Sequence, residues 1–208
     1  MTEPRPLIEL SSAGLDLGGT LSLMSNSYAQ PILRTADLAV ALRVIQQLLG
    51  IADTTELDID YEARISSAPS LTALMELLPD TDWWAEGERD GSSADGDDPL
   101  MHLPVRLQSW AMPPALVAPL LRATGRDPAT VRWDFSGWPE APALGLGAGG
   151  PRGAFVTLCL NSCDLDLDEP ATDHTVFVHV KQVEAERAPW LAAQVGLQVI
   201  GELVMAPH

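Results

Sequence analysis

Cysteine is scarce in this chain. Only Cys159 and Cys163 occur among the 208 residues, four positions apart in a segment, residues 154–163, that is typical of a strand. Residues four apart on a strand are separated by about 13 Å on the same face, which is too far for a disulfide. We therefore predict two buried free thiols and a reducing, cytoplasmic location.

Features that direct a protein to a membrane or out of the cell are also missing. The first twelve residues contain no basic region followed by an apolar stretch, so the sequence shows no signal peptide. Uncharged apolar runs are far shorter than the roughly 20 residues that a membrane-spanning helix requires. Both observations favour a cytoplasmic protein with no membrane partner.

Basic residues are few, and lysine is the rarest of them. The chain has 12 Lys and Arg residues, of which only Lys181 is a lysine, against 29 Asp and Glu residues, so that the net charge is −17. The acidity is concentrated in residues 51–100, which carry fourteen acidic and two basic residues. Such a field repels nucleic acid and steers cationic partners toward this region.

Apolar residues make up 46% of the chain, enough for a folded core. Residues 35–49 are the clearest helix: apolar side chains recur on one face, Thr35 is placed to cap it, Asp37 lies in its first turn, and Gly50 is expected to end it. Other helices are expected at 69–78, 113–125 and 184–195, the second of them interrupted by Pro119.

Strands outnumber helices and often follow one another directly. They are expected as a hairpin over 6–26 and at 54–65, 100–110, 130–135, 154–162, 174–183 and 197–206. Pro104 favours an edge position or a bulge for its strand. Consecutive strands predict a single α+β domain over residues 1–208, with a mixed, mainly antiparallel sheet and about four helices packed on it. Within residues 79–99, which lack apolar periodicity, an acidic mobile loop is expected at about 86–99.

Catalytic and metal-binding motifs are incomplete. Asp164, Asp166 and Asp168 match the first positions of an EF-hand loop, but its glycine and final glutamate are replaced by Glu169 and Thr175. The glycine-rich stretch at 145–150 is followed by a strand. A dinucleotide-binding motif needs a helix there, whose N-terminus would bind the phosphate. We therefore assign no catalytic residue, no metal site and no cofactor.

Acidic and aromatic residues are the best candidates for a binding surface. Alternation along 54–65 places its acids on one strand face. Trp83 and Trp84 lie among acids, an arrangement that suits an interface for a basic partner, although one of them could instead close the core. Trp138, in the segment WDFSGWPE, is equally open to either role, whereas Trp110, Trp133 and Trp190 are expected in the core. The predicted partner-binding residues are Glu56, Asp58, Asp60, Glu62, Asp80, Asp82, Trp83, Trp84, Glu86 and Trp138.

In size, acidity, the preference for arginine over lysine that is typical of a GC-rich bacterial gene, and lack of a catalytic motif, the chain resembles the immunity proteins that bacteria make against their own secreted antibacterial toxins, such as type VI secretion toxins. The resemblance is one of type and covers the whole chain, and WDFSGWPE is the one segment that looks like a signature. It implies a protein that binds and blocks a cationic cognate toxin, often a nuclease, whose basic groove the carboxylates could enter or flank. The alternatives are a secretion chaperone or adaptor, and a small metal- or carboxylate-dependent enzyme.

Overall fold

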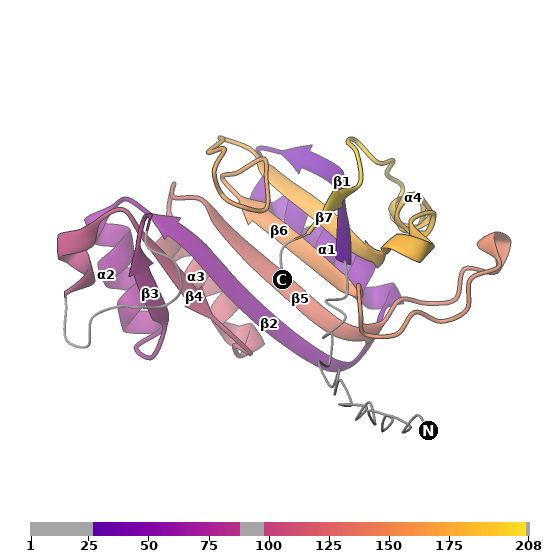
Figure 1. The fold of residues 1–208 in the computed structure, drawn as a ribbon, viewed down its shortest axis with the longest axis horizontal. Coiled ribbons are helices and arrows are strands. Elements are labelled where there is room, and N and C mark those ends of the chain that lie inside the picture. Colours follow the sequence, from indigo (N-terminus) through magenta and orange to yellow (C-terminus); the bar gives the residue numbers. More distant parts are fainter. Residues whose placement is uncertain (1–26, 88–97, 207–208) are drawn as a thin grey trace, which may run out of the picture.

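One antiparallel sheet organises the molecule. The computed structural model describes residues 27–87 and 98–206, where eight strands lie in the order β3-β4-β2-β5-β6-β7-β1-β8 (Figure 1). The α+β prediction is confirmed, but each neighbouring pair of these strands is antiparallel, so the sheet is not mixed. The strands are β1 Ser27–Thr35, β2 Asp53–Ile65, β3 Asp82–Ala85, β4 Val105–Ser109, β5 Ala129–Gly137, β6 Phe155–Leu160, β7 His174–Lys181 and β8 Val204–Met205.

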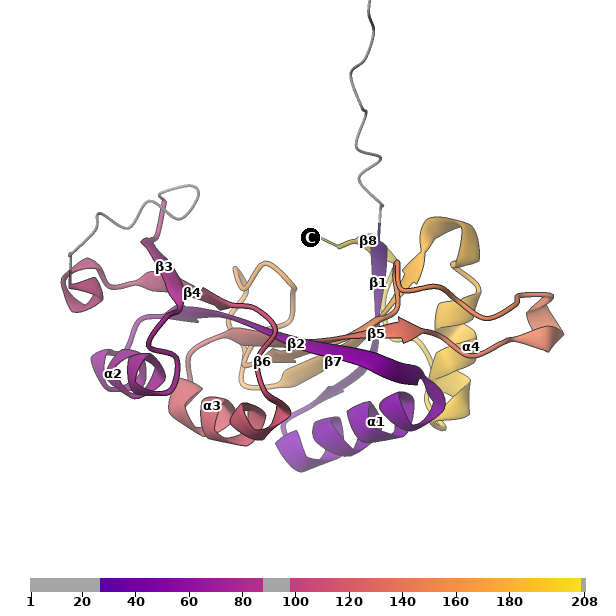
Figure 2. The ribbon, with the colours of Figure 1, turned by 90° about the horizontal axis from the view of Figure 1, so that it is seen from below.

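Helices cover one face of this sheet. They are α1 Leu38–Ile51, α2 Ala68–Leu77, α3 Val117–Thr124 and α4 Arg187–Gln194. Figure 2 shows α1, α2 and α3 side by side beneath the strands, while α4 packs near β7 at one end. The main core lies between these two layers and includes Leu48 of α1, Leu74 of α2, Leu120 of α3 and Leu191 of α4. In the described residues, no helix packs on the opposite face.

Helix α1 begins and ends differently from expectation. Asp37 caps it, because its carboxylate accepts hydrogen bonds from Ala39 N (2.9 Å) and Val40 N (3.3 Å). Thr35 acts one step earlier, and its hydroxyl oxygen accepts a bond from Asp37 N (3.1 Å). Gly50 does not end the helix, which continues to Ile51. The bond from Ala52 N to Leu48 O (3.1 Å) closes its last turn.

Both proline expectations are wrong, for the same reason. Pro104 precedes β4 and only its carbonyl joins the pairing, where it accepts a bond from Glu86 N (3.1 Å). Strand β4 therefore pairs on both sides, with β2 and with β3, and it contains no bulge. Pro119 lies in the first turn of α3, where a backbone N–H has no intrahelical acceptor, so the helix is not interrupted. A proline disrupts an element only where its missing N–H would have been bonded.

Other boundaries also differ. Residues 82–85, within the segment expected to lack regular structure, form β3 at the sheet edge. At the C-terminal end only Val204 and Met205 form a strand, where 197–206 was expected. The predicted hairpin at 6–26 and most of the predicted loop at 86–99 lie outside the described residues. Of that loop, Glu86 is ion-paired with Arg64 (2.7 Å).

The Pro/Gly-rich connection between β5 and β6 projects from one end of the sheet as an arm (Figure 1). Close backbone approach explains one of its glycines: a Cβ on Gly149 would lie 3.2 Å from Trp138 N, and Gly149 N donates to Trp138 O (2.8 Å). The buried guanidinium of Arg187 donates to the carbonyls of Pro139 and Gly147. A side chain from α4 therefore holds the base of the arm.

Candidate functional site

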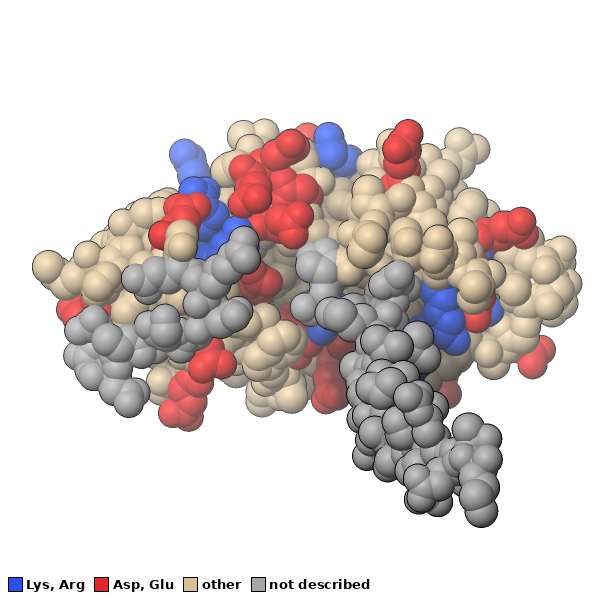
Figure 3. Space-filling model, viewed as in Figure 1, with Lys and Arg blue, Asp and Glu red and all other residues tan. Residues whose placement is uncertain are grey.

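The sheet face opposite the helices carries the charged residues and is called here the polar face. Directly paired residues on antiparallel strands project to the same side. The register pairs Asp58 with Asp134, Asp60 with Arg132 and Glu62 with Thr130, and on the other side of β2 it pairs Glu62 with Gln108. Figure 3 looks at this face and shows acidic side chains gathered around the β6–β7 connection, with basic side chains beside them.

Arg132 is the centre of the first charged cluster. Its guanidinium donates to Asp60 Oδ2 (2.8 Å) and to Asp134 Oδ2 (3.2 Å). Asp60 also accepts a bond from Ala111 N (3.0 Å), so this carboxylate fixes the backbone next to Trp110. Two carboxylates therefore share one guanidinium, and the cluster keeps an excess of negative charge.

Asp134 is the member of this cluster whose ionised form is disfavoured. Burial raises its pKa to about 6 from the usual 3.8; Arg132 opposes the rise, and the neighbouring charges of Asp60 and Asp58 add to it. Asp58 lies directly across the strand pair. Like charges in that position repel each other, so the carboxylate form of Asp134 is disfavoured in the folded protein.

We predict that the substitution Asp134→Asn stabilises the protein at pH 7.5. A carboxyl group with a raised pKa in the folded state destabilises that state above the folded pKa, and the penalty disappears as the pH falls toward the unfolded pKa. A shift of about two pKa units corresponds to about 3 kcal/mol at most. The advantage of the variant should therefore be largest at pH 7.5 and should shrink between pH 6 and about pH 4.

Urea unfolding of both proteins at several pH values measures this effect. Glu140→Gln, at an exposed site, is the control for the change of charge and should leave the pH dependence unchanged. A variant that is less stable than the parent at pH 7.5 would show instead that the Arg132 ion pair dominates the energetics of Asp134.

Arg106 is the centre of a second cluster. It donates to Glu62 Oε1 (3.0 Å) and, with another nitrogen, to Asp168 Oδ1 (3.1 Å) and Asp166 O (2.8 Å). These bonds tie the β6–β7 connection to the middle of the polar face. Burial raises the pKa of Glu62, although its hydrogen bond to Arg106 acts in the opposite direction.

Of the four acids expected on one face of β2, only two are therefore free of basic partners among the described residues. Asp60 and Glu62 are paired with arginines from neighbouring strands, whereas Glu56 and Asp58 are exposed on the surface. Alternation in the sequence predicted the same role for all four acids and did not indicate a role for Arg132. The available signal was the matching alternation of Arg132 and Asp134 with apolar residues in β5, but the register with β2 is not visible in the sequence.

The paired tryptophans of β3 lie on opposite faces. Trp83 pairs with Leu107, packs on the main core and contacts the His102 ring at 5.6 Å between centroids. Trp84 pairs with Arg106 and thus projects to the polar face. Asp80 and Asp82 are exposed, the former in the α2–β3 connection and the latter at the start of β3.

Two other tryptophans differ in burial, and one of them lies where it was not expected. Trp138 is only 2% exposed, and its indole nitrogen donates to His179 O (2.7 Å) and Gly153 O (3.1 Å), so we place it in the core. Trp110 was expected in the core but is 51% exposed. It follows the last residue of β4, and its ring lies 6.0 Å from the Arg132 guanidinium carbon. Trp133 lies in the core as predicted, and Trp190 is partly buried.

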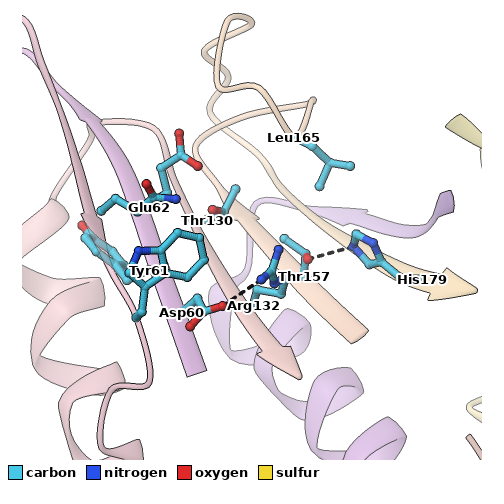
Figure 4. A pocket seen from close by; sticks show the side chains of 10 residues that line it. Asp60, Tyr61, Glu62, Thr130, Arg132, Thr157, Leu165 and His179 are labelled. Carbon is cyan, nitrogen blue, oxygen red and sulfur yellow. Dashed lines mark hydrogen bonds and ion pairs between the residues drawn. The ribbon is translucent and has the colours of Figure 1, made fainter. Parts of the chain in front are cut away.

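A pocket of about 90 Å³ opens on the polar face between Trp110 and the strands β2, β5, β6 and β7. Figure 4 shows Arg132 between Asp60 on one side and the Thr157–His179 pair on the other. Thr157 Oγ1 lies 2.8 Å from His179 Nε2, but the two residues are only 2% and 3% exposed. The pocket thus presents mainly carboxylate, guanidinium and indole groups to a ligand.

Within the described residues, no group of three or more His, Cys, Asp and Glu side chains is arranged to hold a metal ion. Two of the EF-hand-like aspartates are engaged with protein groups: Asp164 accepts bonds from Asp168 N (3.1 Å) and Glu169 N (2.7 Å), and Asp168 pairs with Arg106 (3.1 Å). Cys159 is buried and Cys163 partly buried, and both are free thiols. No helix in the described ranges is long and apolar enough to cross a membrane.

Models of protein families, curated protein sequences and solved structures were each compared with this chain, and none matches.

Proposed function

We propose that this protein binds a cationic protein through its polar face and thereby neutralises it, as immunity proteins neutralise toxins. The observation that supports the proposal best is the composition of that face. Carboxylates from β2 and β5 outnumber the arginines among them, and a half-exposed tryptophan, Trp110, stands at their margin. Large aromatic anchors combined with like-signed charges are typical of surfaces that bind an oppositely charged protein.

The exposed charges on this face are suited to attracting a cationic partner from a distance more than to forming tight ion pairs with it. Glu56 and Asp58 are exposed, and among the residues described here no ion pair engages them. Asp60 and Glu62, in contrast, are held by arginines and help to keep the surface in shape. Exposed charges act mainly on the rate of encounter, which rises when the partner carries a basic groove.

A small carboxylate-dependent enzyme is the second candidate. Glu62 favours it, because a carboxyl group with a raised pKa beside a pocket is a common general acid or base. Against it, Glu62 is committed to Arg106, and the Thr157–His179 pair is almost completely buried. A nucleophile must reach its substrate, so the binding function has more support.

The direct test uses the protein encoded next to this gene. We expect that neighbour, produced alone in a laboratory bacterium, to stop growth, and we expect co-production of this protein to restore growth. The two purified proteins should form a complex whose association rate falls steeply with salt. Changing Glu56→Gln and Asp58→Asn together should slow association at low salt by about threefold to tenfold and leave dissociation nearly unchanged.

The double variant Glu140→Gln/Glu202→Gln is the matched control, because it removes the same charge from two exposed sites on other segments. It should associate at close to the parent rate. A neighbour that is harmless and unbound would overturn the proposal, and so would a complex whose formation ignores both salt and the change at Glu56 and Asp58.

A further inference from the structure

A groove of about 360 Å³ lies at the end of the sheet where β4 ends and β3 begins. It runs between the C-terminal end of α2 and the segment that leads from β4 to α3. Its floor is apolar and includes Leu78, Met112 and Leu116. Leu78 and Met112 also belong to the main core, so the floor is a continuation of the packed interior.

The charge in this groove has one sign. Asp80 and Asp82 are the charged groups among the described residues that line it, and both are exposed at its rim. Trp110 forms a wall that the groove shares with the pocket on the polar face. Arg132 lies 6.0 Å from this indole ring, but Asp60 and Asp134 neutralise its charge. A cation in the groove therefore meets carboxylates and an aromatic surface.

Hydrogen bonds hold the groove in shape. Thr81 donates its hydroxyl proton to Gln108 O (2.8 Å), which fixes the α2–β3 connection to β4. On the other side, Met112 N donates to Ile59 O (2.7 Å) and Ala111 N donates to Asp60 Oδ1 (3.0 Å). A site that is formed before binding loses little conformational entropy when it is filled.

We propose that this groove receives an arginine side chain of the cationic partner, and that it anchors the complex that the polar face steers. The inference rests on the proposed function and adds the chemistry of the anchor. Arginine fits each part of the groove: its aliphatic stem packs on the apolar floor, its planar guanidinium stacks on Trp110, and its N–H groups reach Asp80 and Asp82. Lysine lacks the planar fork and should bind less well.

A short leucine–arginine–leucine peptide tests the groove without the partner. NMR of the ¹⁵N-labelled protein follows the indole N–H signal of Trp110, which the variant Trp110→Phe identifies. The arginine peptide should shift this signal, and the same peptide with citrulline, which is nearly isosteric and uncharged, should bind at least about fivefold more weakly. The double variant Asp80→Asn/Asp82→Asn should weaken the arginine peptide by a similar factor.

Glu140→Gln/Glu202→Gln is again the matched control and should bind the arginine peptide as the parent does. Equal binding of the citrulline peptide, or unchanged binding by the Asp80/Asp82 variant, would overturn the proposed anchor. The function proposed above fails differently, through a neighbour that does not bind. If the complex with the neighbour forms normally with the Asp80/Asp82 variant, the proposed function stands and the anchor is overturned.

Discussion

Replacing Arg187 with alanine is expected to lower the free energy of unfolding by about 3–5 kcal/mol. Arg187 is 1% exposed, pairs with Glu184 through Nε (2.9 Å), and donates to the carbonyls of Pro139 and Gly147. Truncation leaves these acceptors without their donor in a place where water has little access, and an unpaired buried polar group is strongly destabilising. Urea unfolding followed by tryptophan fluorescence measures the loss.

Two further variants make the result specific. Arg122→Ala removes an exposed arginine from α3 and should change the stability by less than about 0.5 kcal/mol. Arg187→Met restores the lost volume but none of the donors, so it should remain destabilised by a large part of the alanine effect. Full recovery by methionine would mean that Arg187 contributes by filling space and that its hydrogen bonds to the arm matter little.

Replacing Trp138 with alanine should be similarly severe, at about 3–5 kcal/mol. The indole fills a site that is 2% exposed, stacks edge-on against Phe135 with 4.7 Å between ring centroids, and donates to two carbonyls that would otherwise lack this partner. The same unfolding measurement applies. If the variant kept parental stability but lost binding to the partner, the interface role considered for Trp138 from sequence would be the right one.

Trp110→Ala is the natural comparison, because it removes the same side chain from a half-exposed site that also lies just beyond the end of a strand. It should change the stability by less than about 1 kcal/mol. Trp138→Phe keeps most of the ring and loses the N–H donor, and it should fall between the parent and the alanine variant. The two variants thus distinguish a buried tryptophan that stabilises the fold from an exposed one that does not. The sequence around the two residues does not reveal this difference.

Several elements could be predicted because they depend on local sequence alone. The alternation of acids and apolar residues in β2 places Asp58, Asp60 and Glu62 on one face, as expected. The apolar stripe of α1 follows equally from periodicity. The effects of Pro104 and Pro119 could not be predicted in the same way. They depend on where the strand or helix begins, and such boundaries are hard to predict from sequence.

The charge state of the candidate surface was decided by long-range contacts. Asp60 lies 72 positions from Arg132, and Glu62 lies 44 positions from Arg106. Composition shows that residues 51–100 are acidic, but strand register determines which carboxylates are neutralised by arginines of β4 and β5. Four acids with equal roles predicted from the sequence are therefore divided in the structure into two exposed and two ion-paired residues.

By itself, the sequence determined the fold class, the faces of the main strands and the excess of acid, since each depends on composition or on periods of a few residues. The tertiary structure alone decided which tryptophan is buried and which is exposed, because burial depends on where a strand lies in the sheet and on what packs over it. For this reason Trp138, open to either role from the sequence, is buried, whereas Trp110, expected in the core, is half exposed. The groove beside Trp110 exists only because α2, β3 and the β4–α3 segment meet there.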